Sequence, residues 1–317
     1  MTRHVALVGP TAAGKSALAL EIARSDARFE IVSLDSMQVY RGMDIGTAKP
    51  TRAERDEVPH HLIDVVDPGE EWSVARSQRN ARAAIAEIDA RGRRALLVGG
   101  TGLYVHAVID GFTLPGEDRE VRAGLEERTA GAAGLAAAWQ ELCDSDAAAA
   151  ARIDPRNRRR IVRALEVIAV TGRPFSSFGP GVFDGSGRRD DQDPPRPSRC
   201  CMLAVWRPRA ELAEAIGRRV AAMRAAGLAD EVATLRVGPW ARSARQAIGY
   251  KEIDAALAGG ATASALDAAF ELVARRTRHF ARRQRMWFRR DPRVTWIHAA
   301  TSLELGQIAR AIVAEPS

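Results

Sequence analysis

The stretch "HVALVGPTAAGKSALAL", residues 4–20, joins an apolar run to a helical pattern through a glycine-containing loop. Within it, residues 9–16 read "GPTAAGKS" and fit the pattern G-x-x-x-x-G-K-[ST] in full. In such loops the glycines permit the turn, backbone N–H groups point inward, and the start of the following helix adds positive potential. Lys15 is expected to hold phosphate oxygens and Ser16 a Mg²⁺ ion. The stretch therefore predicts a phosphate-binding loop between a strand and a helix.

The first half of the chain alternates β-rich runs with helical patterns. Short apolar strands separated by helices indicate a parallel sheet that is covered by helices on both faces. The predicted fold class is thus α/β, with a parallel sheet of the P-loop NTPase type. Ligands in such sheets bind at the carboxyl ends of the strands. The predicted strands are residues 4–9, 29–36, 61–66 and 94–100, and the predicted helices are residues 15–24 and about 73–91.

After Leu114 the pattern changes to an alanine-rich, helical one without strands. Residues 184–199, "DGSGRRDDQDPPRPSR", cannot build a core and predict a mobile loop. The run "CCMLAVW" that follows predicts another buried strand, which returns the chain to the sheet. The predicted organisation is a catalytic core formed by residues 1–114 and 199–317, interrupted by an all-helical insertion domain at 115–198 whose segment 184–198 is mobile.

Composition and cysteine usage narrow the class of protein. Of the 317 residues, 46% are hydrophobic and 27% charged, which is ordinary for a globular protein. No window approaches about 18 consecutive apolar residues, so no membrane span is predicted. The first residues lack the features of an export signal. Cys143, Cys200 and Cys201 are too few and wrongly spaced for a disulfide framework or a zinc site. These features favour a cytoplasmic protein.

Positive charge is concentrated near the end of the chain. The net charge is +7, and residues 200–317 carry 19 basic against 11 acidic residues. Residues 275–290, "RRTRHFARRQRMWFRR", contain eight arginines and no acid. This asymmetry favours a polyanionic partner such as nucleic acid, with a solvated helix in an arginine-rich protein as the alternative.

A long helix is predicted across this basic stretch. Ser264 and Asp267 have the spacing of a capping box at its start. Alternating steps of four and three residues predict one buried stripe, with the arginines on the other faces. The stripe consists of Leu266, Phe270, Val273, Thr277, Phe280, Gln284 and Trp287.

Two polar residues follow strands beside the phosphate-binding loop in the predicted sheet. Asp35 follows "IVSL" and Thr101 follows "LLVGG". A kinase or ATPase requires an apolar strand that ends in a metal-holding aspartate, but here glycine and Thr101 follow the strand. From the residues alone, Asp35 could be a kinase base, a magnesium ligand, or a base for another reaction.

Five further stretches make the sequence recognisable, because they occur in a fixed order behind the loop. Together they closely resemble the tRNA dimethylallyltransferases, prenyltransferases that modify the adenine directly 3′ of the anticodon. The resemblance covers most of residues 4–110 and 200–298, together with "RRRIVRALEV" in the insertion. The five stretches are "DSMQVYRGMDIGTAKP", "HHLIDVVDP", "LLVGGTGLYV", "IGYKE" and "TRHFARRQRMWF".

The resemblance implies that the loop holds the diphosphate of dimethylallyl diphosphate, with Mg²⁺ and without ATP. The diphosphate would be the leaving group. Breaking an allylic C–O bond develops charge on it, which N–H donors, Lys15 and Mg²⁺ would stabilise. Arg219 matches the family's clamping arginine, and its neighbour Arg218 is the alternative. The implied diphosphate-binding residues are Gly9, Thr11, Ala12, Ala13, Gly14, Lys15, Ser16 and Arg219, and Ser16 is also the implied metal ligand.

The acceptor implied by the resemblance is the exocyclic N6 of the tRNA adenine. Asp35 would act as general base and Thr101 would help position the reacting groups. The family resemblance also favours a monomer. The implied tRNA contacts are Asp35, Ser36, Met37, Gln38, Thr101, Arg122, Arg159, Arg160, Ile161, Val162, Arg163, Gln246, Ala247, Ile248, Gly249, Tyr250 and Lys251.

Two other classes of function compete with this interpretation. An ATP-dependent small-molecule kinase is favoured by the phosphate-binding loop alone, but the basic last third and the missing strand-end aspartate argue against it. A non-catalytic RNA-binding ATPase or chaperone would explain the arginines, but it gives no task to Asp35 and Thr101.

Overall fold

The computed structural model describes residues 4–111, 114–178, 200–298 and 302–314. Its internal contacts divide the chain into two compact units. One unit contains residues 1–111 and 195–317, and the other contains residues 112–194. The loop predicted at 184–199 lies outside the described residues.

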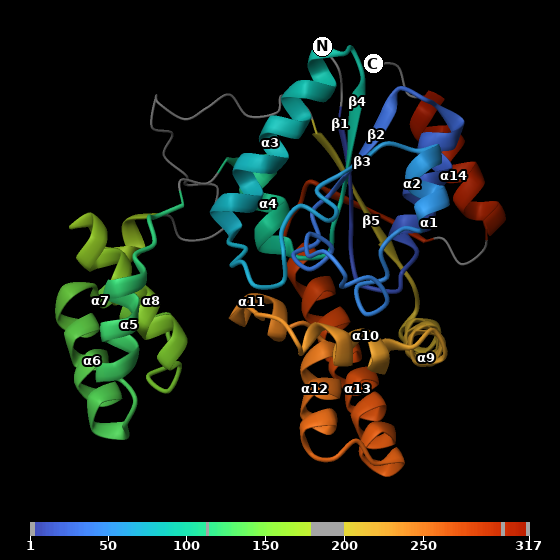
Figure 1. Ribbon diagram of the computed structural model, residues 1–317. Helices are drawn as coiled ribbons and strands as arrows, with labels where there is room; N and C mark the ends of the chain where they lie inside the picture. Colours follow the sequence, from blue (N-terminus) through green and yellow to red (C-terminus); the bar gives the residue numbers. More distant parts are fainter. Residues whose placement is uncertain (1–3, 112–113, 179–199, 299–301, 315–317) are drawn as a thin grey trace. The chain divides into compact units, whose positions relative to one another are not determined.

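Within the described residues, six parallel strands form one sheet in the order β3-β2-β4-β1-β5-β6 (Figure 1). Its central strands are runs of apolar residues that are buried on both faces, as expected for a parallel sheet between two helical layers. The predicted parallel α/β sheet is therefore confirmed. The strands are β1 (His4–Val8), β2 (Phe29–Ser33), β3 (His60–His61), β4 (Arg94–Val98), β5 (Cys200–Trp206) and β6 (Val294–His298).

Helices cover both faces of this sheet (Figure 1). Helices α3 (Val74–Ala90) and α4 (Gly102–Asp110) pack on one face, where Ile88 and Val108 are fully buried. Helices α1 (Lys15–Ser25) and α14 (Ser302–Ala314) pack against each other on the opposite face. A short helix, α2 (Arg52–Glu57), begins with a capping box formed by Thr51 and Glu54. These two helical layers cover the faces of the sheet and not the carboxyl ends of its central strands, which is where ligands bind in such folds.

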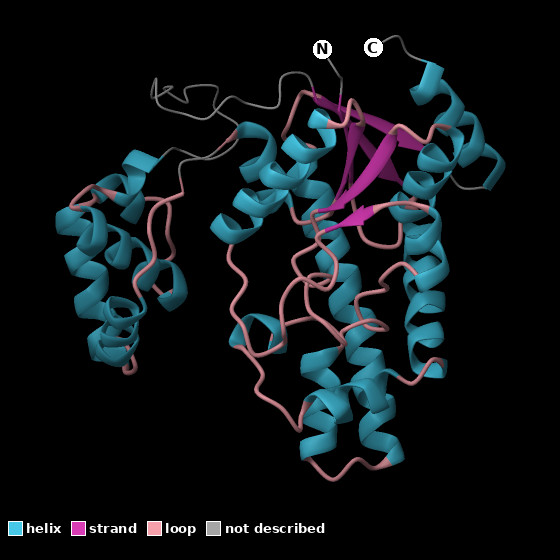
Figure 2. Cartoon of the chain, turned by 45° about the horizontal axis from the view of Figure 1, so that its top comes forward, coloured by secondary structure: helices cyan, strands magenta, loops and turns pink. Residues whose placement is uncertain are grey.

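A second group of helices lies beyond the carboxyl ends of the strands (Figure 2). Its core contains Tyr40 and Tyr250, both fully buried, and Phe270 of the long helix α13. The helices are α9 (Arg209–Ala225), α10 (Leu228–Leu235), α11 (Arg242–Arg245), α12 (Tyr250–Ala258) and α13 (Ala263–Phe288).

In the described part of the unit of residues 112–194, every regular element is a helix, and loops connect the helices. Its core is formed by apolar side chains such as Leu142, Ile161 and Leu165. Its elements are α5 (Arg119–Arg128), α6 (Ala132–Ser145), α7 (Ala147–Ala150), α8 (Arg158–Thr171) and a 3₁₀ turn at Phe175–Phe178.

The structure corrects two details of the sequence-based expectations. The strand expected at 61–66 is reduced to His60–His61, followed by an isolated bridge between Tyr40 and Val66. The long helix starts at Ala263 with Thr262 as its N-cap, so the capping box expected from Ser264 and Asp267 is wrong. Thr262 is the N-cap because its side chain accepts the N–H of Ala265.

The stripe predicted on this helix is buried at Phe270, Val273 and Gln284, with Phe280 and Trp287 half-buried. The arginines lie on the other faces, as expected. Among the described residues, no helix is long and apolar enough to cross a lipid bilayer.

Candidate functional site

Four neighbouring strands bring the predicted catalytic and phosphate-binding groups to one edge of the sheet. Asp35 follows β2, Thr101 follows β4 and the loop at 9–16 follows β1, and these strands are adjacent in the order β2-β4-β1. The fourth strand, β5, ends at Trp206 beside β1. Because all these pairings are parallel, the residues that follow the strands share the carboxyl edge, where ligands bind in such sheets.

The backbone of the phosphate-binding loop requires its two glycines. Gly9 has φ +120°, and a Cβ atom there would lie 2.5 Å from the carbonyl oxygen of Val205. Gly14, with φ +112°, is the residue before the first turn of α1. Any side chain at Gly9 would push β1 away from β5. The loop thus has the backbone form that its sequence predicts.

Lys15 is the central cation of this loop. Its Nζ atom donates to the carbonyl oxygen of Pro10 at 2.8 Å, which leaves two further protons for a ligand. Burial, followed by repulsion from Arg219, lowers the pKa of Lys15 from 10.5 to about 8, while the charge of Asp35 acts in the opposite direction. An anion bound here would restore the charged form of Lys15.

The structure distinguishes the two candidate clamping arginines. Arg219 Nη1 donates to Thr11 Oγ1 at 3.1 Å, and Nη2 donates to the carbonyl oxygen of Thr47 at 3.5 Å. Arg218 points to the surface, where its side chain is 69% exposed and pairs with Glu214 at 3.7 Å. Burial lowers the pKa of Arg219, and the negative charge of Asp35 counteracts this. Of the two neighbours, Arg219 is the one that contacts the phosphate-binding loop.

Asp35 is held by the turn that follows β2. Its Oδ1 atom accepts the N–H of Met37 at 2.8 Å and that of Gln38 at 3.3 Å. This is the Asx-turn arrangement, in which a side chain replaces a backbone carbonyl. The turn fixes the orientation of the carboxylate and leaves Oδ2 as the atom that can take a proton.

Thr101 stands at the N-terminus of α4 without capping it through its side chain. Its hydroxyl group is therefore not used to cap the helix. The neighbouring Gly100 lies against Gln284 of α13, whose Oε1 accepts the N–H of Thr11 at 2.8 Å. Gln284 is buried and connects the phosphate-binding loop to the loop before Thr101. We missed this role in the sequence, although a polar residue in a buried stripe is a signal for such a contact.

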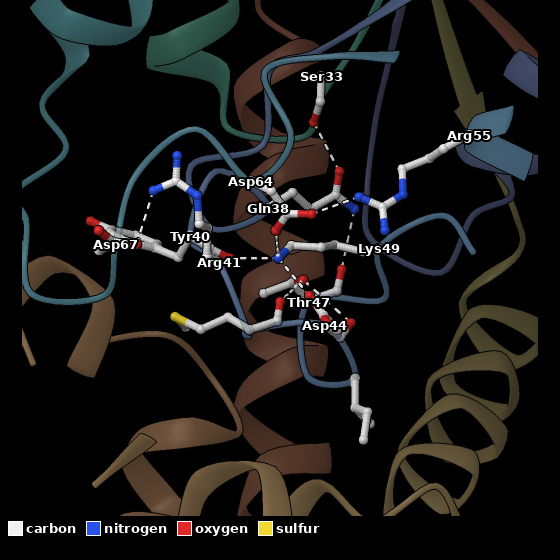
Figure 3. A network of polar contacts seen from close by, with 12 residues as sticks. Ser33, Gln38, Tyr40, Arg41, Asp44, Thr47, Lys49, Arg55, Asp64 and Asp67 are labelled. Atoms are coloured by element: carbon white, nitrogen blue, oxygen red, sulfur yellow. Dashed lines mark hydrogen bonds and ion pairs between the residues drawn. The ribbon is translucent and has the colours of Figure 1, made fainter. Parts of the chain in front are cut away.

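The segment after Asp35 is fixed by a network of polar contacts (Figure 3). Gln38 accepts the hydroxyl hydrogen of Ser33 at 2.9 Å and donates to the carbonyl oxygens of Thr47 and Ala48. Ser36 and Met37 are half-buried. The side chain of Gln38 is thus positioned from both sides before any substrate binds.

Lys49 is the centre of the same network (Figure 3). Its side chain is 2% exposed, and Nζ donates to Tyr40 O at 2.5 Å, Asp44 Oδ1 at 2.6 Å and Asp64 Oδ1 at 2.5 Å. All three protons of the ammonium group are used, so Lys49 stabilises the loop and does not bind a ligand.

Glu231 of α10 anchors the middle of this loop. Its Oε2 atom accepts the N–H groups of Asp44 at 2.9 Å and Ile45 at 2.8 Å, and Oε1 accepts that of Gly46 at 3.3 Å. The hydroxyl group of Tyr250 donates to Oε1 at 2.5 Å. The same loop continues to Thr47, whose carbonyl oxygen accepts hydrogen bonds from Gln38 and Arg219. Glu231 therefore stabilises the loop that positions these two residues.

In the segment 246–251, the polar residues at the two ends are exposed, and the residues between them are buried or half-buried. Gln246 and Lys251 are exposed and bonded to each other at 3.0 Å, whereas Ala247, Gly249 and Tyr250 are buried and Ile248 is half-buried. A pocket lies beside this segment, at the start of α12 and against α13. It is lined by Gln246, Ile248, Lys251, Glu252, Arg276, His279 and Arg283. Its lining includes the basic side chains of Lys251, Arg276 and Arg283, which suit RNA phosphates.

In the helical unit, two predicted RNA-contacting arginines have structural partners. Arg122 and Arg163 both pair with Glu166, which is fully buried. Arg163 also donates to the carbonyl oxygens of Pro115 and Gly116. The side chains of Ile161 and Val162 are buried, so only their backbone could touch a ligand. Arg159 and Arg160 are exposed on α8.

The residues near the loop fit a magnesium ion that is held mainly by substrate phosphates. Ser16 lies exposed in the first turn of α1. The described residues contain no group of three His, Cys, Asp or Glu side chains that could hold a metal. Mg²⁺ usually keeps several waters and takes few protein ligands beside phosphates. One hydroxyl group next to a phosphate-binding loop suits that coordination.

Two models of protein families match the chain. The model described as IPP transferase matches residues 38–291, and the model described as isopentenyl transferase matches residues 2–64. A tRNA dimethylallyltransferase of Kineococcus radiotolerans is 48% identical over 316 residues, covering 98% of this chain and 95% of that protein. One of Streptomyces avermitilis is 47% identical over 322 residues, covering 99% and 96%.

Solved structures resemble the chain along its whole length. The crystal structure of a tRNA isopentenylpyrophosphate transferase from Bacillus halodurans has a TM-score of 0.69 at 40% identity, covering 99% of this chain and 96% of that one. A eukaryotic dimethylallyltransferase acting on tRNA shares the fold, with a TM-score of 0.77 at 24% identity and coverage of 99% and 78%. Identity of this extent, spread over both units, shows that the chain belongs to the IPP transferase family.

Proposed function

We propose that the protein transfers a dimethylallyl group from dimethylallyl diphosphate to N6 of the adenine 3′-adjacent to the anticodon in tRNA, releasing diphosphate. The names of its full-length relatives support this reaction. The observation that carries it is the adjacency of Asp35 and the phosphate-binding loop at one sheet edge, on strands β2, β4 and β1. This brings a fixed carboxylate to the same edge as a site for a diphosphate.

The proposed reaction exchanges one bond for another. The bond between C1 of the allyl group and the diphosphate oxygen breaks, and its electron pair leaves with the diphosphate. The lone pair of N6 forms the new C–N bond, and the proton released from N6 goes to Asp35. Among the described residues, Oδ1 accepts the N–H groups of Met37 and Gln38 and Oδ2 has no hydrogen-bond donor, so Oδ2 is the atom that takes the proton. A base positioned in this way contributes about 10²- to 10⁴-fold.

The leaving group is stabilised by the residues of the loop. Charge grows on the diphosphate as the C–O bond breaks, and preformed donors stabilise charge most where it develops. Lys15 and Arg219 supply the cations, and the N–H groups at 12–16 supply the remaining donors. We assign the diphosphate to Gly9, Thr11, Ala12, Ala13, Gly14, Lys15, Ser16 and Arg219. When bound, Mg²⁺ at Ser16 would neutralise part of the developing charge.

The acceptor adenine must leave its stack to reach this edge of the sheet. Extrusion of a base costs a few kcal/mol and is easiest from a single-stranded loop. We assign contacts with the extruded base and its neighbours to residues 35–38 and Thr101. For the RNA backbone we assign Gln246, Lys251 and the exposed arginines of α13 in one unit, and Arg159 and Arg160 in the other. We further propose that the protein acts as a monomer, which light scattering can test.

A transfer assay tests this function directly. The protein and Mg²⁺ are incubated with radiolabelled dimethylallyl diphosphate and unmodified tRNA without ATP, and the RNA is then digested to nucleosides. We expect label on N6 of the adenine next to the anticodon. A tRNA with guanine at that position is the matched control and should remain unlabelled. If no RNA is labelled and ATP is hydrolysed in a parallel reaction, the loop serves a nucleotide and the proposal is wrong.

A further inference from the structure

Arg207 is a further cationic residue in contact with the phosphate-binding loop. It is the first residue after β5, the strand that pairs with β1. Its Nε atom donates to the carbonyl oxygen of Ala13 at 3.1 Å. One of its terminal nitrogens, Nη2, lies 3.6 Å from the position of a Cβ atom on Gly14. The guanidinium group therefore lies beside the residues that lead into α1.

Arg207 has no aspartate or glutamate partner within the described residues, in contrast to Arg218, which pairs with Glu214. The Nε bond uses one of five N–H donors, so Nη1 and Nη2 keep four. The side chain is half-buried, and a half-buried arginine without an acid is suited to bind an anion.

Two arginines contact the loop at different points. Arg219 donates to the side chain of Thr11 near its start, whereas Arg207 donates to Ala13 near its end. Both belong to the segment formed by β5 and α9. A diphosphate has two phosphoryl groups, and an arginine can bind each of them through parallel N–H···O bonds.

We propose that Arg207 is a second arginine ligand of the diphosphate, holding the phosphoryl group that lies toward β5 through Nη1 and Nη2. This inference rests on the proposed function of the loop as a diphosphate site. Arg207 would bind the diphosphate in the ground state and hold it more strongly as the leaving group gains charge.

The test compares three variants with the wild-type protein in binding inorganic pyrophosphate, measured by calorimetry over a series of salt concentrations. R207A should bind about 10- to 100-fold more weakly, because a charged hydrogen bond is lost. R207A should also show a weaker salt dependence, because one charge contact is gone. R207K should recover part of the affinity. R209A is the matched control, since Arg209 is exposed two residues further on, and it should bind as the wild type does.

Three outcomes would overturn the role of Arg207. In the first case, the affinity of R207A differs from that of the wild type by less than twofold. Alternatively, its affinity falls while the salt dependence stays unchanged, which means that Arg207 only supports the loop through Ala13. In the third case, R209A weakens binding as much as R207A. Thermal unfolding of each variant checks folding, and R207K keeps the test usable if R207A does not fold. If the wild type itself binds no pyrophosphate and transfers no prenyl group, the proposed function has failed instead.

Discussion

Arg219 of α9 donates from Nη1 to Thr11 Oγ1 at 3.1 Å, although 208 positions separate the two residues in the chain. The contact places a guanidinium group directly on the phosphate-binding loop. The preceding residue, Arg218, pairs with Glu214 at the surface. Neighbours on a helix point about 100° apart, so only one of them can face the loop.

Replacing Arg219 with alanine should therefore raise the KM for dimethylallyl diphosphate by about 10- to 100-fold, because a charged hydrogen bond to the substrate is lost. R218A is the matched control and should leave the KM unchanged. Steady-state transfer kinetics measure both. Equal effects of the two substitutions would show that general positive charge, rather than the contact at Thr11, determines binding.

The pKa of Lys15 predicts a pH dependence of binding. Burial and Arg219 lower this pKa to about 8, so part of the lysine is neutral above that pH. A bound diphosphate favours the ammonium form, and binding at pH 9 must take up a proton. Affinity should therefore fall by up to about tenfold per pH unit above pH 8, whereas near pH 6.5, where Lys15 stays charged, it should add no pH dependence.

Calorimetry in two buffers of different ionisation enthalpy measures this proton uptake. In K15R, whose side chain stays charged, uptake at pH 9 should disappear. The same shift makes the unliganded protein more stable as the pH rises from about 8 to 10.5, because the folded state no longer holds a charged ammonium away from water. Binding at pH 9 without proton uptake would contradict the lowered pKa.

Replacing Asp35 should lower kcat far more than it lowers the affinity for tRNA. D35N keeps the oxygen that accepts the N–H of Met37, so the turn is preserved while the base is lost. We expect kcat to fall by about 10²- to 10⁴-fold. The control is D67N, since Asp67 is 68% exposed and pairs with Arg41. Gel-shift and transfer assays separate the two effects, and an equal loss of tRNA affinity in D35N would rule out a base role.

Arg159 and Arg160 should bind tRNA phosphates without supporting the fold. Both are exposed on α8, whereas Arg163 bonds to Pro115, Gly116 and the buried Glu166. The double variant R159A/R160A should weaken tRNA binding and reduce the slope of log K against log salt by about 2, one per phosphate contact. R52A, at a 91% exposed position of α2, should change neither.

Pyrophosphate affinity of R159A/R160A should equal that of the wild type. R163A should instead lower the unfolding temperature, because it leaves two carbonyl groups and a buried carboxylate with fewer partners. A salt slope that stays the same in R159A/R160A would place the RNA elsewhere on the protein.

Glu231 should stabilise the loop that supports Arg219 and Gln38. E231A removes the acceptor of three consecutive backbone N–H groups at 44–46 and of the Tyr250 hydroxyl. We expect the free energy of unfolding to fall by about 1–3 kcal/mol in urea titrations. E271A, at a 76% exposed position of α13, is the control and should have little effect. Equal stability of both variants would mean that the loop holds its form without Glu231.

Much of the fold is readable from local patterns. The alternation of apolar runs and helical segments predicted the parallel sheet, and the run at 200–206 predicted the strand that returns the chain to it. These predictions succeed because side-chain periodicity and glycine positions act within a few residues. Strand β6 was not predicted, and the start of α13 was predicted at the wrong cap.

The sequence by itself determined the backbone form of the glycine-containing loop at 9–16, the strand-end positions of Asp35 and Thr101, and the arginine-covered surface of α13. Only the tertiary structure decided that Arg219 rather than Arg218 meets the loop, that Gln284 binds Thr11 from 273 positions away, and that Lys49 is a buried structural cation. The physical reason is that these contacts depend on how each helix is rotated against the sheet. That rotation is set by packing, as Ile216 and Val220 are buried on α9, and packing joins residues that no local pattern relates.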